Sequence, residues 1–259
     1  MILIDTHCHL NHDPLADRLD PVLLRATAAS VHQIIIPSYD TPSWSAVATL
    51  ATRENIFPAF GLHPWEAHTV TPGELIHALG AQVSFPPGPV AIGEIGLDTK
   101  LPPGGPDLDT QLAVLRPQLD LADDLDLPVI LHCRGAFEIL LDELTRFEGR
   151  LRGVVHAWSR GPELAERFTA MGLALGIGGA VTRPTARRVR RTVQHLPLES
   201  FILETDAPSI GLDGVPPEET EPAHVADIAA AVAELRGESI DTVAEVTTAH
   251  AQRLFKLPT

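Results

Sequence analysis

The sequence predicts a single (β/α)8 TIM barrel, and three observations carry that prediction. Short apolar runs alternate with longer amphipathic segments along all 259 residues, which is typical of a parallel sheet covered by helices. The length accommodates about eight such repeats in one domain. Histidines and carboxylates follow several of the runs, as expected of an active site at the carboxyl ends of barrel strands. We therefore expect one domain over residues 1–259, with its site on that face.

Eight apolar runs are predicted to form the strands. Each is short and continuously apolar, which favours a buried parallel strand over a half-exposed antiparallel one. An open doubly wound sheet is the alternative, although no G-x-G-x-x-G follows the first run, and Gly176–Gly179 is expected to be a tight turn. The runs are Ile2–Ile4, Gln33–Ile36, Ile56–Phe60, Val90–Ile92, Pro128–Leu131, Gly153–Val155, Leu173–Ile177 and Phe201–Leu203.

The segments between the runs supply helices and loops. Helical patterns extend over Leu112–Leu125, Ala136–Phe147 and Pro162–Met171. Two segments, Leu101–Pro106 and Ile210–Pro222, contain too much proline and glycine for regular structure. In a barrel they are expected at the carboxyl ends of the strands, where loops contact substrate.

Composition restricts the partners and the compartment. A formal charge of -15 argues against a broad nucleic-acid footprint, but not against a nucleic-acid end entering a pocket that carries cations. No apolar stretch reaches the roughly 18 residues of a membrane span, and no basic leader precedes the first run. Without a secretion signal, Cys8 and Cys133 are not expected to pair. We expect a cytoplasmic protein that does not enter a membrane, with a monomer favoured. The cluster Arg183–Arg191 is interpreted as a solvated helix face, with phosphate binding as the less favoured alternative.

Metal-ligating side chains follow five of the runs. His7 and His9 lie two residues apart after the first run, so in an extended segment they share one face. Four histidines and two carboxylates exceed the needs of one four-coordinate zinc ion and suit two divalent cations bridged by a carboxylate. Glu94, between Gly93 and Gly96, is expected in a tight turn, and Cys8 is expected to point away from the ligands. The candidate ligands are His7, His9, Glu94, His132, His156 and Asp206, with Glu204 expected to support them.

These residues stand in motifs that resemble the TatD family of metal-dependent hydrolases. The matching segments are Asp5–His9, Gly61–Pro64, Gly93–Asp98, Leu127–His132 and Glu204–Pro208. The resemblance implies that His7, His9 and Asp206 hold one metal, that His132 and His156 hold the other, and that Glu94 bridges them. The chain departs from the family at Trp158, where phenylalanine is usual, at Trp65, where many members have histidine, and at Thr99, where an aromatic residue is usual.

The resemblance implies a hydrolase of ester bonds, deoxyribonuclease-like, with Zn2+ expected and Mg2+ or Mn2+ as contenders. Asp206 would act as general base, Glu94 would join it in catalysis, and His63, Arg134 and Trp158 would contact substrate. That substrate is expected to be a small or single-stranded nucleic-acid end, or a small phosphoester. The alternatives are hydrolysis of a small-molecule amide, lactone or phosphate ester at the same metals, and a non-catalytic metal-binding barrel. Lys100 and Lys256 end no core strand, which disfavours a carboxylated-lysine bridge.

Overall fold

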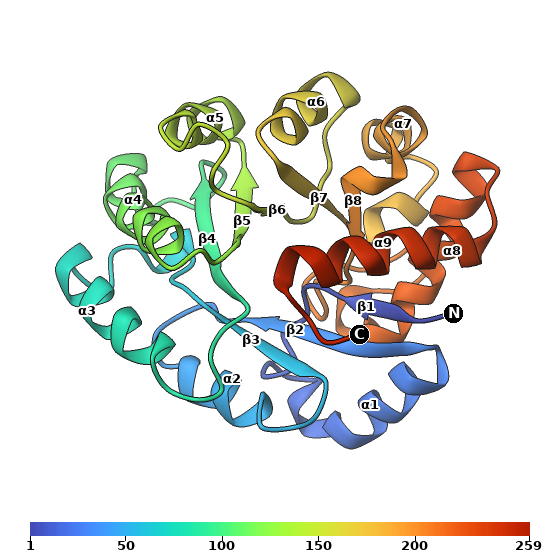
Figure 1. Ribbon diagram of the computed structural model, residues 1–259, viewed down its shortest axis with the longest axis horizontal. Coiled ribbons are helices and arrows are strands. Elements are labelled where there is room, and N and C mark those ends of the chain that lie inside the picture. The colour runs from blue at the N-terminus through green and yellow to red at the C-terminus, as the bar shows by residue number, and fades with distance from the viewer. The chain divides into compact units, whose positions relative to one another are not determined.

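The computed structural model describes all residues from 1 to 259. Eight strands, β1 to β8, alternate with helices along the chain, which confirms the predicted (β/α)8 class (Figure 1). The chain separates into two compact units: unit 1 comprises Met1–Ile36 and His156–Thr259, and unit 2 comprises Pro37–Val155. The prediction of one domain stays a prediction.

Unit 1 contains both ends of the chain. Strand β1 pairs in parallel with β2, and β7 pairs in parallel with β8. The last helix contacts both β1 and β8 (Figure 1). The Thr248 hydroxyl of this helix donates to the carbonyl of Ile2 at 2.8 Å. The elements are β1 Leu3–Asp5, η1 Ala16–Arg18, α1 Leu19–Ala28, β2 Val31–Pro37, α6 Pro162–Ala170, β7 Leu173–Ile177, η3 Gly179–Thr182, α7 Arg187–His195, η4 Leu198–Ser200, β8 Phe201–Leu203, η5 Pro217–Glu219, η6 Pro222–His224, α8 Val225–Arg236 and α9 Ile240–Phe255.

Unit 2 contains the four strands from β3 to β6, each parallel to the next. Its longest helix begins where the Asp107 carboxylate accepts a hydrogen bond from the amide of Thr110 at 2.9 Å, a side-chain cap. The elements are α2 Trp44–Leu50, β3 Ile56–Phe60, η2 Pro64–Glu66, α3 Pro72–Val83, β4 Ala91–Asp98, α4 Leu108–Asp124, β5 Val129–Arg134, α5 Phe137–Thr145 and β6 Gly153–Val155.

The strands are buried on both faces, as their continuous apolarity predicts. Every residue of β4, β7 and β8 is buried, which is the condition of a parallel strand covered by helices. Four strands, β3, β6, β7 and β8, have the predicted bounds. The three predicted helices are present as α4, α5 and α6, with ends shifted by up to four residues.

The expected turn at Glu94 is wrong, because β4 continues through it to Asp98. The flanking glycines serve a close approach to β5 instead. A Cβ on Gly93 would lie 2.6 Å from Cβ of Ile130, and one on Gly96 would collide with the carbonyl of His132. The pairing register between β4 and β5 shifts between Ile92 and Ile95. This irregularity re-aims side chains without ending the strand.

The loops agree in outline with the sequence. Residues 101–106 form no regular element, whereas the segment 210–222 includes the short helix η5. Gly176 and Ile177 belong to β7, and the chain turns after them into η3. None of the helices combines the length and apolarity needed to span a membrane.

Candidate metal centre

In unit 1, backbone pairing brings the segment after β1 beside the segment after β8. The amide of Asp206 donates to the carbonyl of His7 at 2.8 Å, and the amide of His9 donates to the carbonyl of Ala207 at 2.8 Å. The Asp5 carboxylate accepts from the amide and the hydroxyl of Thr205 at 2.9 and 2.6 Å. Burial raises the pKa of Asp5 to about 7, against the lowering effect of these hydrogen bonds. Residues about 200 positions apart are therefore held at fixed spacing.

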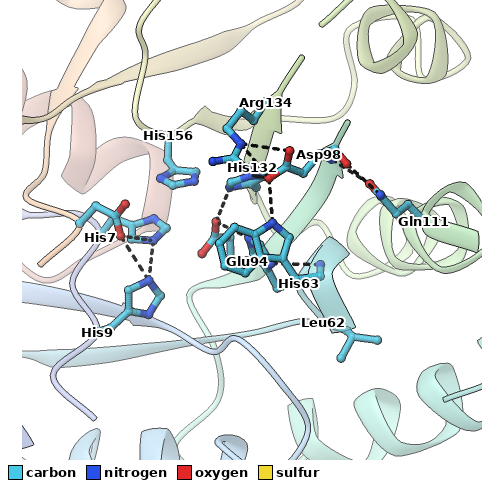
Figure 2. A network of polar contacts seen from close by, with 12 residues as sticks. His7, His9, Leu62, His63, Glu94, Asp98, Gln111, His132, Arg134 and His156 are labelled. Atoms are coloured by element: carbon cyan, nitrogen blue, oxygen red, sulfur yellow. Dashed lines mark hydrogen bonds and ion pairs between the residues drawn. The ribbon is translucent and has the colours of Figure 1, made fainter. Parts of the chain in front are cut away.

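His7, His9 and Asp206 form a triangle of ligand atoms within unit 1. Figure 2 shows the two histidines of this triangle facing each other. Nε2 of His7 lies 3.2 Å from Nε2 of His9, and Oδ1 of Asp206 lies 3.7 and 3.3 Å from these two nitrogens. Tetrahedral zinc with bonds of about 2.0–2.1 Å separates its ligand atoms by roughly 3.3 Å. The edges of the triangle match that spacing, so these residues fit a divalent cation.

The Asp206 carboxylate is ionised in this setting. Burial alone would raise its pKa, but the hydrogen bond with His9 and the charges of His7 and His156 outweigh burial and hold the pKa below its usual value. His7, His9 and Asp206 are 0, 4 and 7 % exposed. A buried anion beside two imidazoles is the charge arrangement that a cation site requires.

His156 and Glu204 adjoin this triangle. The His156 ring stacks on the His7 ring with centroids 4.2 Å apart, and its Nδ1 lies 3.8 Å from Oε1 of Glu204. That oxygen accepts a hydrogen bond from the amide of Ala157 at 2.5 Å, so Glu204 also fixes the backbone that follows His156. Burial raises the pKa of Glu204 to about 8. A side chain on Gly176 would overlap this carboxylate, so only glycine leaves room for it.

In unit 2, Glu94 lies between two histidines (Figure 2). Its Oε1 is 3.0 Å from Nδ1 of His132 and 3.3 Å from Nε2 of His63. Glu94 is 3 % exposed, and its amide donates to the carbonyl of Ser38 at 3.0 Å. The ligand atoms of Glu94, His63 and His132 lie within 4.8 Å of one another, close enough to share an ion.

Hydrogen bonds on the far side of each ring distinguish the two histidines. Nε2 of His132 lies 3.3 Å from Oδ2 of Asp98 and Nδ1 lies 3.0 Å from Oε1 of Glu94, so each ring nitrogen faces a carboxylate oxygen to which it can donate. A cation held between Nδ1 and Glu94 would replace the Nδ1 proton and leave the Nε2 proton on Asp98. Nδ1 of His63 instead accepts from the amide of Trp65 at 3.2 Å. Neutral His63 therefore carries its proton on Nε2. His132 is fitted to ligate, and His63 is fitted to donate a hydrogen bond.

The remaining predicted substrate residues lie in different surroundings. Arg134 is half-exposed at the end of β5, and its Nε donates to Asp98 at 3.1 Å. Trp158 is 1 % exposed, with its ring 5.7 Å from that of Phe168 and its indole N–H on the carbonyl of Arg160. Any influence of Trp158 on a substrate therefore acts through the loop that follows His156. The Cys8 thiol is buried and lies 3.7 Å from the carbonyl of Ala207.

Sequence reasoning missed several residues that fix the surroundings of His63 and His132. The side-chain amide of Gln111, in α4, makes two hydrogen bonds with the backbone of Asp98 (Figure 2). It accepts from the Asp98 N–H at 2.8 Å and donates to the Asp98 carbonyl at 2.9 Å. Gln118, seven residues further on, accepts from the amide of Leu62 at 2.8 Å. Tyr39 stacks on the His63 ring at 4.8 Å. The available signal was a pair of glutamines spaced by seven on the apolar face of a helix, a placement that amides avoid unless they are bonded.

Comparison with known proteins identifies the family. Residues 4–256 match the family described as TatD related DNase. The chain belongs to the TatD family. It is 38 % identical over 259 residues to an uncharacterized metal-dependent hydrolase, YjjV, of Escherichia coli, with 98 % of each chain covered. The crystal structure of YjjV superposes with a TM-score of 0.93 at 36 % identity, covering 99 % of this chain and 98 % of that one.

A relative with a named activity lies somewhat further away. Human deoxyribonuclease TATDN3 is 31 % identical over 266 residues, with 98 % of this chain and 94 % of that protein covered. This TatD protein is thus a member of a family of metal-dependent hydrolases, and both of its units carry His and carboxylate groups able to hold a metal ion.

Proposed function

We propose that this TatD protein is a phosphodiesterase of the deoxyribonuclease type that acts on the end of a single strand. The observation that carries the proposal is the triangle of His7, His9 and Asp206, whose edges of 3.2–3.7 Å suit a divalent cation. The deoxyribonuclease name of the human relative supports the substrate class.

The proposed centre holds two cations. His7, His9 and Asp206 would hold one, His132 and His156 the other, and Glu94 would bridge them, with Zn2+ favoured over Mg2+ and Mn2+. Family membership and the position of each ligand at a strand end support this arrangement, because such ends supply the active site of (β/α)8 barrels. When bound, the cations lower the pKa of a water molecule and neutralise charge on a phosphoryl oxygen.

The chain's own residues supply the proton transfers and the orientation. Oδ1 of Asp206 faces the two imidazoles, which leaves Oδ2 to accept the proton of the attacking water. The Nε2 proton of His63 is directed at Glu94 and keeps that carboxylate oriented. Arg134, fixed through its Nε and Nη2, offers its Nη1 group to a non-bridging phosphate oxygen.

The test is Asp206→Asn, assayed on a 5′-labelled single-stranded oligodeoxynucleotide after chelation and reloading with Zn2+, Mg2+ or Mn2+. General-base loss is worth about 10²–10⁴ in rate, so we expect at least a hundredfold decrease, with metal content measured on the same sample. Asp17→Asn, an exposed carboxylate with no role in the site, is the matched control. Wild-type cleavage by the loaded D206N protein would exclude Asp206 as the base. Cleavage of lactones or amides but of no phosphodiester would favour the alternative hydrolase.

A further inference from the structure

Trp65 is placed unlike the other tryptophans. It lies in η2, directly after β3, and is 38 % exposed, whereas Trp44 and Trp158 are 6 and 1 % exposed. A lone exposed apolar side chain needs no explanation. The exposure of Trp65 does need an explanation, because the surrounding residues fix the orientation of its ring.

One hydrogen bond and two aromatic contacts hold the Trp65 ring, and a second hydrogen bond holds its backbone amide. Its indole N–H donates to Oδ2 of Asp98 at 2.7 Å, the same oxygen that lies 3.3 Å from Nε2 of His132. Its amide donates to Nδ1 of His63. The His63 and Tyr39 rings meet it edge-on at 5.2 and 6.1 Å. A ring fixed in this way loses little conformational entropy when a ligand stacks on it.

Arg134 places a cation over one face of this ring, which leaves the other face for a stacked ligand. Its guanidinium carbon lies 5.8 Å from the centroid of Trp65, and Asp98 and the carbonyl of Lys100 hold its Nε and Nη2. Nη1 takes part in neither contact, and the side chain is 48 % exposed. Asp98 thus fixes three groups together: a ligand histidine, an indole and a guanidinium.

We propose that Trp65 is the stacking platform for the base of a nucleotide whose phosphate is bound by Arg134. A planar ring joined to a phosphate is the chemistry that an exposed indole beside a guanidinium recognises. Because every base has a stacking face, this contact favours nucleotides over small phosphoesters without selecting a sequence. The inference rests on the proposed function and extends it by naming the part of the substrate that Trp65 contacts.

The test compares the binding of deoxyadenosine 5′-monophosphate with that of deoxyribose 5-phosphate by calorimetry on the metal-loaded protein. Stacking is worth about 1–3 kcal/mol per base, or roughly 5- to 150-fold in affinity. We expect the wild type to prefer the nucleotide by such a factor and Trp65→Leu to lose that preference while still binding deoxyribose 5-phosphate. Trp65→Phe, which keeps a ring, should fall between them. Phe85→Leu removes another exposed aromatic of unit 2 and is the matched control.

Two outcomes would overturn the platform. Either W65L and W65F bind the nucleotide as the wild type does, or they lose both ligands equally, which would make Trp65 a support for the shape of the site. Because binding is measured without turnover, the outcome is separate from that of the proposed function. If the protein prefers the nucleotide through Trp65 but cleaves no phosphodiester, the stacking role of Trp65 stands and the proposed phosphodiesterase activity is wrong.

Discussion

Asp98 accepts hydrogen bonds from the rings of His132 and Trp65, from the guanidinium of Arg134 and from the amide of Lys100. Burial would raise the pKa of this carboxyl, but these hydrogen bonds outweigh burial and hold the pKa well below its usual range. Asp98 is therefore a constant anion, and the proton on Nε2 of His132 is fixed by it. This is the usual means by which a carboxylate sets the tautomer of a metal-ligating histidine.

Asp98→Asn should weaken metal binding while leaving the fold intact. The amide keeps the shape but removes the charge, so Nε2 of His132 loses its preferred acceptor and Nδ1 becomes a poorer ligand. Changes of this kind cost about 10–100-fold in metal affinity. The measurement is competition for Zn2+ against a chromophoric chelator, with circular dichroism to verify folding. Asp142→Asn, on an exposed part of α5, is the control, and equal affinities in all three proteins would contradict the role given to Asp98.

At the residue scale, the sequence points to candidate ligands more readily than to the residues that support them. His7 and His9 stand out because histidine after an apolar strand has few other uses, and Asp206 because it follows the last strand. The position of the proton on Nε2 of His63 depends on a hydrogen bond from the amide of Trp65, two residues away. The hydrogen bonds between Gln111 and Asp98 depend on how α4 packs. Such contacts follow from tertiary packing, which leaves no periodic signature in the chain.

Helix α9 packs on β8 through a histidine that stays neutral. Nδ1 of His250 lies 3.2 Å from the carbonyl of Phe201, and since a carbonyl only accepts, this nitrogen carries the proton. Burial lowers the pKa of His250, the Phe201 contact opposes this, and Arg253 adds to the lowering. The unfolded chain therefore binds a proton on His250 at a higher pH than the folded chain does.

Acidification should consequently destabilise the wild type more than His250→Asn. The contribution of His250 is fully present above the unfolded pKa of about 6.5 and is lost as the pH falls toward the lower folded value, by at most about 1.4 kcal/mol per pH unit. Urea unfolding at pH 7.5, 6.5 and 5.5 measures the difference. Asn at position 250 keeps an N–H donor near the carbonyl of Phe201, and the weaker helix propensity of Asn does not depend on pH. The exposed His32→Asn is the control, and parallel pH profiles for wild type and H250N would contradict this account.

At the scale of the elements, the predicted bounds are correct for strands that are almost entirely buried. Strands β3, β6, β7 and β8 have the predicted bounds because each apolar run ends at a glycine or a polar residue. The same criterion ends β4 and β5 too early, since their polar residues belong to the strands. Glu94 and His132 are polar residues inside β4 and β5, so hydrophobicity alone could not place them in a strand.

On the scale of the whole chain, the candidate ligands of unit 1 lie on segments that are distant in sequence. His7 precedes Asp206 by about 200 residues, yet a backbone hydrogen bond of 2.8 Å joins the two. A cation bound to both would bind the folded chain and not the unfolded one, because the unfolded chain holds no such triangle. Metal binding should therefore be linked to the stability of the fold.

Metal removal should lower the melting temperature of this protein. At a free Zn2+ concentration of one hundred times Kd, one site contributes about 2.7 kcal/mol, which for a chain of this size corresponds to roughly 5–10 °C. Differential scanning calorimetry of chelated and reloaded protein measures the shift. His9→Asn removes one corner of the triangle and should reduce the response to Zn2+, while the exposed His32→Asn should respond as the wild type does. Equal melting temperatures for chelated and reloaded wild type would show that these residues bind no metal that stabilises the folded protein.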